Sequence, residues 1–189
     1  MNIRQALSVA IIFVSYIGAT YGQSDKRIFL GIQPAITIEP FYDEGELDIN
    51  LFPIIFEAPI TSRANLRIAP IANYHLGGIT NGVSDLSLFT VLPVFFKKTE
   101  NQNDKPYGFY IGPVLGFGRN IINNHYTTTL AFEPGYMFEA KRSFTITLGV
   151  QFGASYFAYD IQPNKWTSHF GPKVTFGFWL NGRTKDVDN

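Results

Sequence analysis

Three residues of the types that cooperate in hydrolytic sites are spread along the chain: Ser155, His169 and Glu39. A serine hydroxyl attacks an acyl carbon when a histidine takes its proton and a carboxylate orients that histidine. Antiparallel pairing across "DIQPNK" would bring Ser155 near His169, and pairing of the first strand with the last would add Glu39. Serine and threonine also fill polar interiors without catalysing anything. We therefore treat the three residues as weak catalytic candidates and favour a protein without catalytic activity.

A second set of polar residues shares one phase of the alternation described below: Arg67, Glu133, Lys173 and Gln151. Ionised side chains inside a protein need opposite charges beside them. Glu133 and Lys173 lie on strands separated by one other strand, so a strand spacing of about 4.8 Å puts them roughly 10 Å apart at the backbone. We expect these two to pair at mid-depth, with Gln151 between them and Arg67 nearer one end. Such a cluster predicts an interior plugged by side chains. A polar pore is the alternative and needs more space.

Several chemistries are disfavoured by what the sequence omits. It holds no glycine-rich phosphate loop leading into a helix, and no HExxH, GxSxG or EF-hand pattern. His75, His125 and His169 are far apart in the sequence, so we predict no metal site, and nothing indicates a cofactor. A formal net charge of zero with 16% charged residues argues against a nucleic-acid partner. The chain has no cysteine, which excludes disulfides and thiolate metal sites.

The segments that carry these residues alternate with a period of two, as β-strands with one apolar face do. In 108–118, bulky apolar residues at odd positions oppose mostly glycine at even positions. The same alternation recurs in 28–40, 65–76, 126–139, 144–156 and 169–178. Segments 47–59 and 86–98 also have strand composition, but their apolar residues occupy both phases, so their faces stay unassigned. Turn-type separators such as "TSRAN" and "EAKRS" divide the chain into eight strands.

The first 22 residues have the layout of a secretory signal peptide. A positive charge at Arg4 precedes an apolar run from Ala6 to Gly18, and small residues follow in "GATYG". This run is shorter than the roughly 18 residues that a membrane-spanning helix needs. We therefore expect 1–22 to be removed on export, which leaves 23–189 as the mature protein.

Long alternating strands fit two kinds of closed barrel. In a soluble carrier barrel the apolar face lines the interior, whereas in a transmembrane barrel it meets lipid. An eight-stranded barrel has a narrow interior, and here the bulky set is apolar while the opposite set is rich in Gly, Ala and Thr. The bulky residues therefore fit better outside. We predict an all-β fold, namely an eight-stranded antiparallel up-and-down transmembrane β-barrel within about 28–180, followed by a short polar tail at 181–189.

In this pattern the chain resembles the small eight-stranded outer-membrane barrels of the OmpA and OmpX type, found in Gram-negative bacteria. The resemblance covers about Ile28 to Leu180 and rests on the alternation rather than on a specific motif. It implies a place in the cell outer membrane, with the lipid bilayer and the barrel-assembly machinery as partners. The chain departs from that group in its short loops and in the tail "NGRTKDVDN", which follows the last aromatic strand "FGFWL".

Most strands also carry a proline near the middle, and these prolines stand at positions 34, 53, 70, 93, 113, 134 and 172. Proline cannot donate to a strand ladder, so we expect bulges or bends there. Wherever the phase is clear, the proline lies on the apolar face. Such prolines would interrupt sticky strands that could aggregate while the chain is unfolded. Alternatively, the prolines are an inherited feature of the lineage and have no selective value.

Three hypotheses for function follow from these observations. A structural or surface-interaction protein with a plugged lumen is favoured, because short loops and a narrow interior leave little room for a binding site. An outer-membrane lipid-modifying enzyme, similar to lipid A deacylases or acyltransferases, would use Ser155, His169 and Glu39. A small pore or transport protein of the porin-like kind would need an open lumen.

Overall fold

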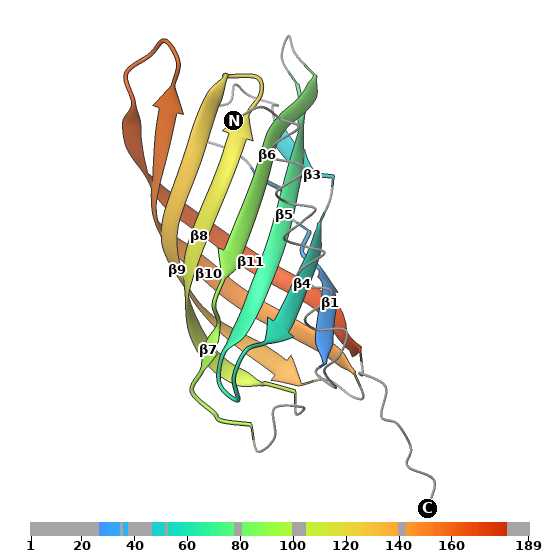
Figure 1. The fold of residues 1–189 in the computed structure, drawn as a ribbon. Helices are drawn as coiled ribbons and strands as arrows, with labels where there is room; N and C mark the ends of the chain where they lie inside the picture. Colours follow the sequence, from blue (N-terminus) through green and yellow to red (C-terminus); the bar gives the residue numbers. More distant parts are fainter. Residues whose placement is uncertain are drawn as a thin grey trace, which may run out of the picture.

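The computed structural model describes residues 27–34, 36–37, 47–51, 53–77, 81–99, 105–139 and 143–180. The signal peptide, Glu39 and the tail 181–189 lie outside these residues, so the predictions about them stay predictions. Within the described residues every regular element is a β-strand (Figure 1). No helix among them is long and apolar enough to cross a membrane.

Eleven strand segments build the described fold: β1 Ile28–Ile32, β2 Ile36–Thr37, β3 Leu47–Asn50, β4 Ile54–Pro59, β5 Asn65–Leu76, β6 Gly82–Val91, β7 Val94–Phe95, β8 Gly108–Asn120, β9 His125–Glu139, β10 Phe144–Tyr159 and β11 Lys165–Leu180. Three passes of the chain are split in two, namely β1 with β2, β3 with β4, and β6 with β7. This leaves eight passes, each antiparallel to its neighbours. Because β1 pairs with both β4 and β11, and β5 pairs with β6, the sheet closes on itself. The predicted all-β, eight-stranded antiparallel up-and-down barrel is confirmed.

The strands are strongly staggered around this barrel. Starting from Thr90 in β6, one chain of paired residues runs through Ile68, Phe56 and Leu30 to Phe178. The other runs through Leu115, Leu130 and Ala154 to Ser168. Both chains end on β11, ten residues apart, and this offset is the shear number of the barrel. Stagger of this kind goes with strands tilted by about 35–45° and an interior that side chains can fill.

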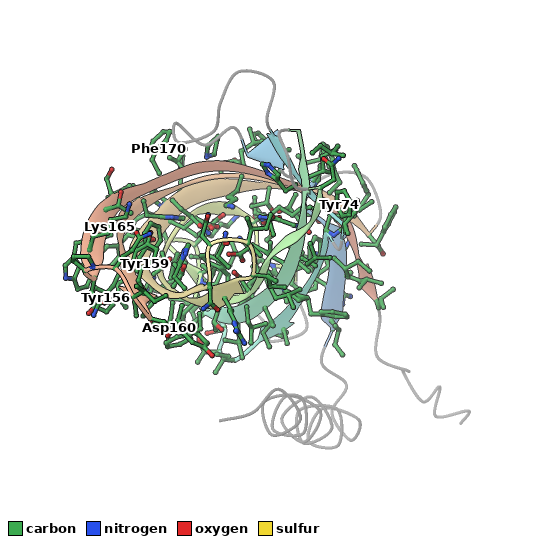
Figure 2. All side chains as sticks on the ribbon, turned by 90° about the horizontal axis from the view of Figure 1, so that it is seen from above. Tyr74, Tyr156, Tyr159, Asp160, Lys165 and Phe170 are labelled. Atoms are coloured by element: carbon green, nitrogen blue, oxygen red, sulfur yellow. The ribbon has the colours of Figure 1, made fainter. Side chains whose placement is uncertain are left out.

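Side chains alternate between the two faces of the wall as predicted. In β8, Phe109 and Phe117 are exposed, whereas Tyr110 and Val114 are buried. The same alternation holds along β1, β9 and the part of β11 from Thr175 to Leu180. Figure 2, a view from above, shows side chains both inside the ring of strands and around it. The inner face is therefore the one rich in small and polar residues.

A β-bulge explains why segment 47–59 has no single face in the sequence. Between the pairs Asn50↔Asn73 and Phe56↔Ile68, the pass formed by β3 and β4 has one residue more than β5. An extra residue turns every later side chain to the opposite face. Odd-numbered residues are accordingly exposed before the bulge and buried after it, as these four show: Ile49, Leu51, Ile55 and Glu57.

Segment 86–98 is apolar on both faces for a different reason. The register of β6 and β7 against β8 is unchanged across the break between them. Their inward-facing residues Val91, Pro93 and Phe95 are buried, and β7 lies toward the lower end of the barrel in Figure 1. The interior is itself apolar at this level, so the two phases of this segment look alike.

Strand interruptions occur at three of the seven prolines, and the β9–β10 ladder also lacks pairs at Pro134. Strands are interrupted at Pro34, at Pro53 and at Pro93. The other four prolines lie within continuous strands: Pro70, Pro113, Pro134 and Pro172. A proline leaves no donor of its own unpaired, and the partner carbonyl that goes short is the better tolerated defect. Mid-strand proline therefore bends or breaks the ladder in some passes and is accommodated in others.

Candidate functional site

An apolar cluster packs inside the barrel. Its buried members are Phe29, Ile55, Ala69, Phe95, Tyr110, Met137 and Trp179. The ring centroids of Phe29 and Trp179 are 5.3 Å apart, and those of Phe95 and Tyr110 are 5.4 Å apart. Close packing of this kind keeps water away from the polar groups beside it, and electrostatic interactions there are stronger than in water.

Glycines on the inner face make room for the rings. A Cβ atom at Gly135 would overlap the Tyr110 ring, and one at Gly149 would lie 3.0 Å from the Tyr110 hydroxyl. The Phe29 ring occupies the space above Gly177 in the same way. The large side chains of the lumen thus lie across the neighbouring strands, which is why a narrow barrel can hold them.

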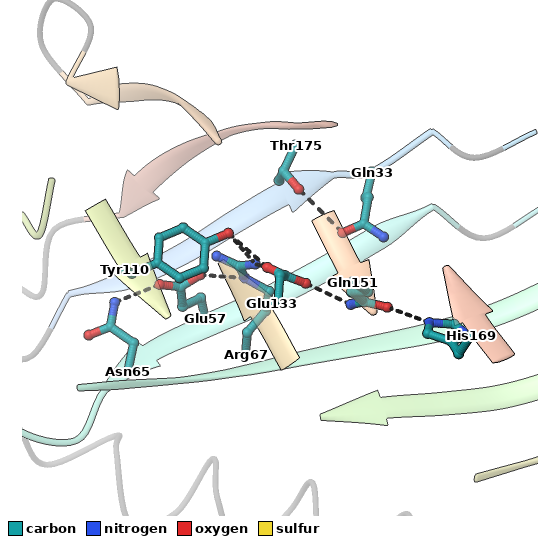
Figure 3. Close-up of polar contacts among 9 residues, drawn as sticks. All are labelled: Gln33, Glu57, Asn65, Arg67, Tyr110, Glu133, Gln151, His169 and Thr175. Carbon is teal, nitrogen blue, oxygen red and sulfur yellow. Dashed lines mark hydrogen bonds and ion pairs between the residues drawn. The ribbon is translucent and has the colours of Figure 1, made fainter. Parts of the chain in front are cut away.

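Arg67 of β5 lies between two carboxylates, those of Glu57 and Glu133 (Figure 3). Its Nε is 2.7 Å from Oε2 of Glu57, and its Nη1 is 2.6 Å from Oε1 of Glu133. All three side chains are almost completely buried. Asn65 donates from Nδ2 to the other oxygen of Glu57 at 2.6 Å. The planar guanidinium suits this task because its donors point in fixed, divergent directions.

Tyr110 and Gln151 complete the hydrogen bonding of Glu133. The Tyr110 hydroxyl donates to Oε1 at 2.7 Å, and Gln151 donates from Nε2 to Oε2 at 2.6 Å. Oε1 of Gln151 lies 3.1 Å from Nε2 of His169, which carries the chain of hydrogen bonds across to β11 (Figure 3). We refer to Glu57, Asn65, Arg67, Tyr110, Glu133, Gln151 and His169 as the lumen network.

The structure corrects the predicted partner of Glu133. Arg67 takes that place, and Lys173 makes no ion pair within 4 Å among the described residues. Lys173 attracts Glu133 only over a longer distance. Gln151 does contact Glu133, so the structure brings Arg67, Glu133 and Gln151 together and leaves Lys173 beside them.

Sequence reasoning misses Glu57, which completes the ion pairing. Its strand could not be given a face, because the bulge between β3 and β4 reverses the phase of the alternation. The sequence does hold a signal for this change of face, since Pro53 stands where the clean alternation ends. Reading the segment as two half-strands of opposite phase would have placed Glu57 inside.

The three catalytic candidates do not form a site among the described residues. His169 is directly opposite Gly153, so Ser155 is displaced by two residues along β10. Ser155 Oγ is hydrogen-bonded to Oγ1 of Thr129 at 2.8 Å, and His169 is bonded to Gln151. Glu39 lies outside the described residues. The described geometry therefore gives the serine no general base.

The histidines also lie apart. His75 and His125 are buried on β5 and β9, whereas the His169 ring stacks on Phe89 with centroids 6.1 Å apart. Within the described ranges, no three His, Asp or Glu side chains gather in a way that could hold a metal ion.

Protein-family models, curated proteins and solved structures offer no match to this chain. Its class is therefore defined by fold and interior alone. It is a closed eight-stranded antiparallel β-barrel with small and polar residues turned inward and an ion-paired network across the lumen.

Proposed function

We propose that the protein is an outer-membrane β-barrel with a structural or surface-interaction role and a lumen that does not conduct ions. The apolar exterior supports the membrane part. Large apolar side chains are exposed on every pass, for example Leu30, Phe56, Leu76, Leu88, Phe117, Phe132, Phe152 and Phe176. Apolar surface of this extent is costly in water and is the required face in lipid. The bilayer and the barrel-assembly machinery are then its partners.

The lumen network supports the proposal that side chains plug the lumen. Arg67 joins β4, β5 and β9 through two buried ion pairs, and Gln151 and His169 extend the contacts to β10 and β11. With Lys173 included, the formal charges of the four ionised side chains at mid-depth cancel. A neutral, mutually bonded set of side chains across a narrow interior leaves no continuous path for ions.

Single-channel recording in a planar bilayer tests this function. The purified protein should show no stepwise currents in concentrated KCl. A triple variant with Glu57→Ala, Arg67→Ala and Glu133→Ala removes the centre of the plug and should open small, frequent steps. Thr129→Ala with Ser155→Ala is a matched control, because it removes inward polar groups outside the network and should stay closed. Regular channel steps in the unmodified protein would overturn the proposed function.

A further inference from the structure

A shallow apolar groove of about 420 Å³ lies on the outer face of the barrel over β8, β9 and β10. Apart from two tyrosines, none of the described residues that line it has a polar side chain. The lining residues used below are Phe96, Phe109, Ile111, Pro134, Tyr136 and Val150. Sites for small ligands have volumes of about 300–1,000 Å³, so the groove is large enough to hold part of an apolar ligand.

The groove lies where the wall is irregular. Pro134 is on the outer face of β9, and no described pairs join β9 to β10 at Pro134 or at the preceding residue, Glu133. Gly135 and Gly149 also line the groove, and a glycine can contribute only backbone atoms to such a lining. The groove therefore reaches down to the backbone beside the interruption of the ladder.

Aromatic rings border one end of the groove. The backbone N–H of Phe96, which follows β7 directly, donates to the carbonyl oxygen of Phe109 at the start of β8, with N and O 3.0 Å apart. Phe109 packs edge-on against Tyr136, with ring centroids 4.7 Å apart. β7 lies toward the lower end of the barrel in Figure 1. The rings therefore mark the end of the groove that is closer to the lower rim of the barrel.

Two lysines follow Phe96 directly and add positive charge at this end of the groove. Lys97 and Lys98 are both exposed, and neither has an ion pair among the described residues. Nζ of Lys97 lies 4.0 Å from the centroid of the Tyr107 ring and donates to the Tyr107 hydroxyl. An ammonium has three donors, so two donors of Lys97 have no described acceptor. Segment 100–104 lies outside the described residues, so the inference uses only these two lysines.

Hydrogen bonds to the turn between β4 and β5 fix the backbone on both sides of the lysines. The N–H of Phe95 donates to the carbonyl oxygen of Arg63 at 2.7 Å. Thr99 donates to the carbonyl oxygen of Ser62 from its N at 3.1 Å and from its Oγ1 at 2.9 Å. The lysines are thus held beside the groove, and the exposed side chain of Arg63 adds a positive charge on the neighbouring turn.

An apolar groove that ends at exposed cations matches an amphiphile with an anionic head. Lysine binds phosphate as a point charge, and basic residues at a membrane surface attract anionic lipids. A second copy of this chain fits less well. Two copies in a bilayer share one orientation, so a twofold contact through the groove would bring the two lysine pairs to the same level, where like charges repel.

We propose that the groove, together with Lys97 and Lys98, binds one anionic phospholipid from the leaflet at the lower end of the barrel. An acyl chain lies over Pro134, against Ile111 and Val150, and the phosphate of the head contacts the two ammonium groups. This inference rests on the proposed function, because such a lipid reaches the groove only if the outer face lies in a bilayer.

Spin-labelled lipids test the contact with the head in reconstituted vesicles of phosphatidylcholine. The unmodified protein should hold labelled phosphatidylglycerol at least several-fold more strongly than labelled phosphatidylcholine, as measured by the motionally restricted fraction of the spectrum. Lys97→Gln with Lys98→Gln should abolish this preference. Arg119→Gln with Lys165→Gln removes two charges at the opposite end of the barrel, near the end of β8 and the start of β11, and should leave the preference unchanged. Equal losses in both double variants would show a general charge effect and overturn the proposal.

A matched pair of tryptophan substitutions tests the groove. Val150 and Val174 are both on the outer face and are 36% and 37% exposed, but only Val150 lines the groove. Val150→Trp fills the groove with a large ring and should weaken the preference for phosphatidylglycerol, although both lysines are still present. Val174→Trp makes the same change on β11 and should have no effect. A preference that survives Val150→Trp undiminished would rule out an acyl chain in the groove.

The remaining outcomes separate this inference from the proposed function. If the unmodified protein forms dimers in detergent that Val150→Trp disrupts, while the lipid preference is unaffected, the groove holds a second copy and the lipid proposal is wrong. If the protein does not insert into vesicles at all, the proposed outer-membrane function fails, and this inference fails with it. Insertion without any preference for phosphatidylglycerol would reject this inference alone.

Discussion

Arg67 joins the two carboxylates of the lumen network. It serves carboxylates from β4 and β9 with two different nitrogens of one rigid group. A lysine at this position would have one mobile point charge and could not hold both carboxylates in fixed geometry. The identity of this residue, and not only its charge, therefore matters.

Arg67→Met should destabilise the folded barrel by about 3–5 kcal/mol, because it leaves two carboxylates buried without a positive charge beside them. Lys173→Met should cost less than about 1 kcal/mol, because Lys173 makes no close ion pair among the described residues. Urea unfolding in lipid vesicles, followed by tryptophan fluorescence, measures both changes.

A double-mutant cycle provides the control. Glu133→Gln combined with Lys173→Met should show a coupling below about 0.5 kcal/mol, whereas Glu133→Gln combined with Arg67→Met should show a much larger one. A larger coupling free energy for Glu133 with Lys173 than for Glu133 with Arg67 would mean that Lys173 is the main counter-charge of Glu133 in solution.

The inner glycines supply a second prediction at this scale. Gly135→Ala should destabilise by about 1–3 kcal/mol, because its Cβ would overlap the Tyr110 ring and come within 2.6 Å of the Leu148 carbonyl oxygen. Gly171→Ala is the matched control, since its Cβ meets only the flexible end of Lys173. Equal unfolding free energies for the two variants would show that the ring can move aside at little cost.

Among the elements, the passes built from two segments depart most from regular strands. The bulge between β3 and β4 places Glu57 on the inner face, and without it this carboxylate would face outward. The interruption at Pro93 keeps its register and puts the proline itself inside. Similar sequence features, a proline in mid-strand, therefore have different structural consequences in different passes.

The two faces of β10 should respond differently to a charge. Leu148 is 44% exposed on the outer face, and Leu148→Arg should cost about 2–4 kcal/mol in a bilayer if this face meets the hydrocarbon. The penalty should shrink when unfolding is measured with short-chain detergent in place of lipid. Thr147→Arg, on the buried inner face, should destabilise equally in both media, because its cost comes from overfilling the lumen. A Leu148→Arg penalty that does not depend on the medium would argue against lipid contact.

For the whole molecule, closure and the apolar exterior have a common consequence. A closed barrel leaves no free edge along its hydrogen-bond ladder, so detergent separates the strands slowly. The mature protein should run at a different apparent mass on a detergent gel before and after boiling. It should also require detergent to stay monomeric. Purification as a soluble monomer without detergent would contradict the outer-membrane proposal.

Alternation along the sequence was enough to predict the closed all-β barrel, the number of strands and the inner face of six of them. The inner faces depend on local periodicity, which each of these six strands shows independently of its neighbours. Seven prolines at similar spacing also marked where the wall is irregular, and three of them mark interruptions.

The partners inside the barrel were decided by the tertiary structure. A shear of ten residues and the bulges in the β3–β4 and β6 passes determine which strand levels meet across the lumen, and neither can be read from a single strand. The long side chain of Arg67 then reaches Glu133 from β5. The order of the strands alone would have predicted Lys173 as the ion-pair partner of Glu133. The sequence by itself determined which residues face inward. Only the closed geometry decided which of them touch, because contacts across a barrel depend on the summed stagger of all eight passes.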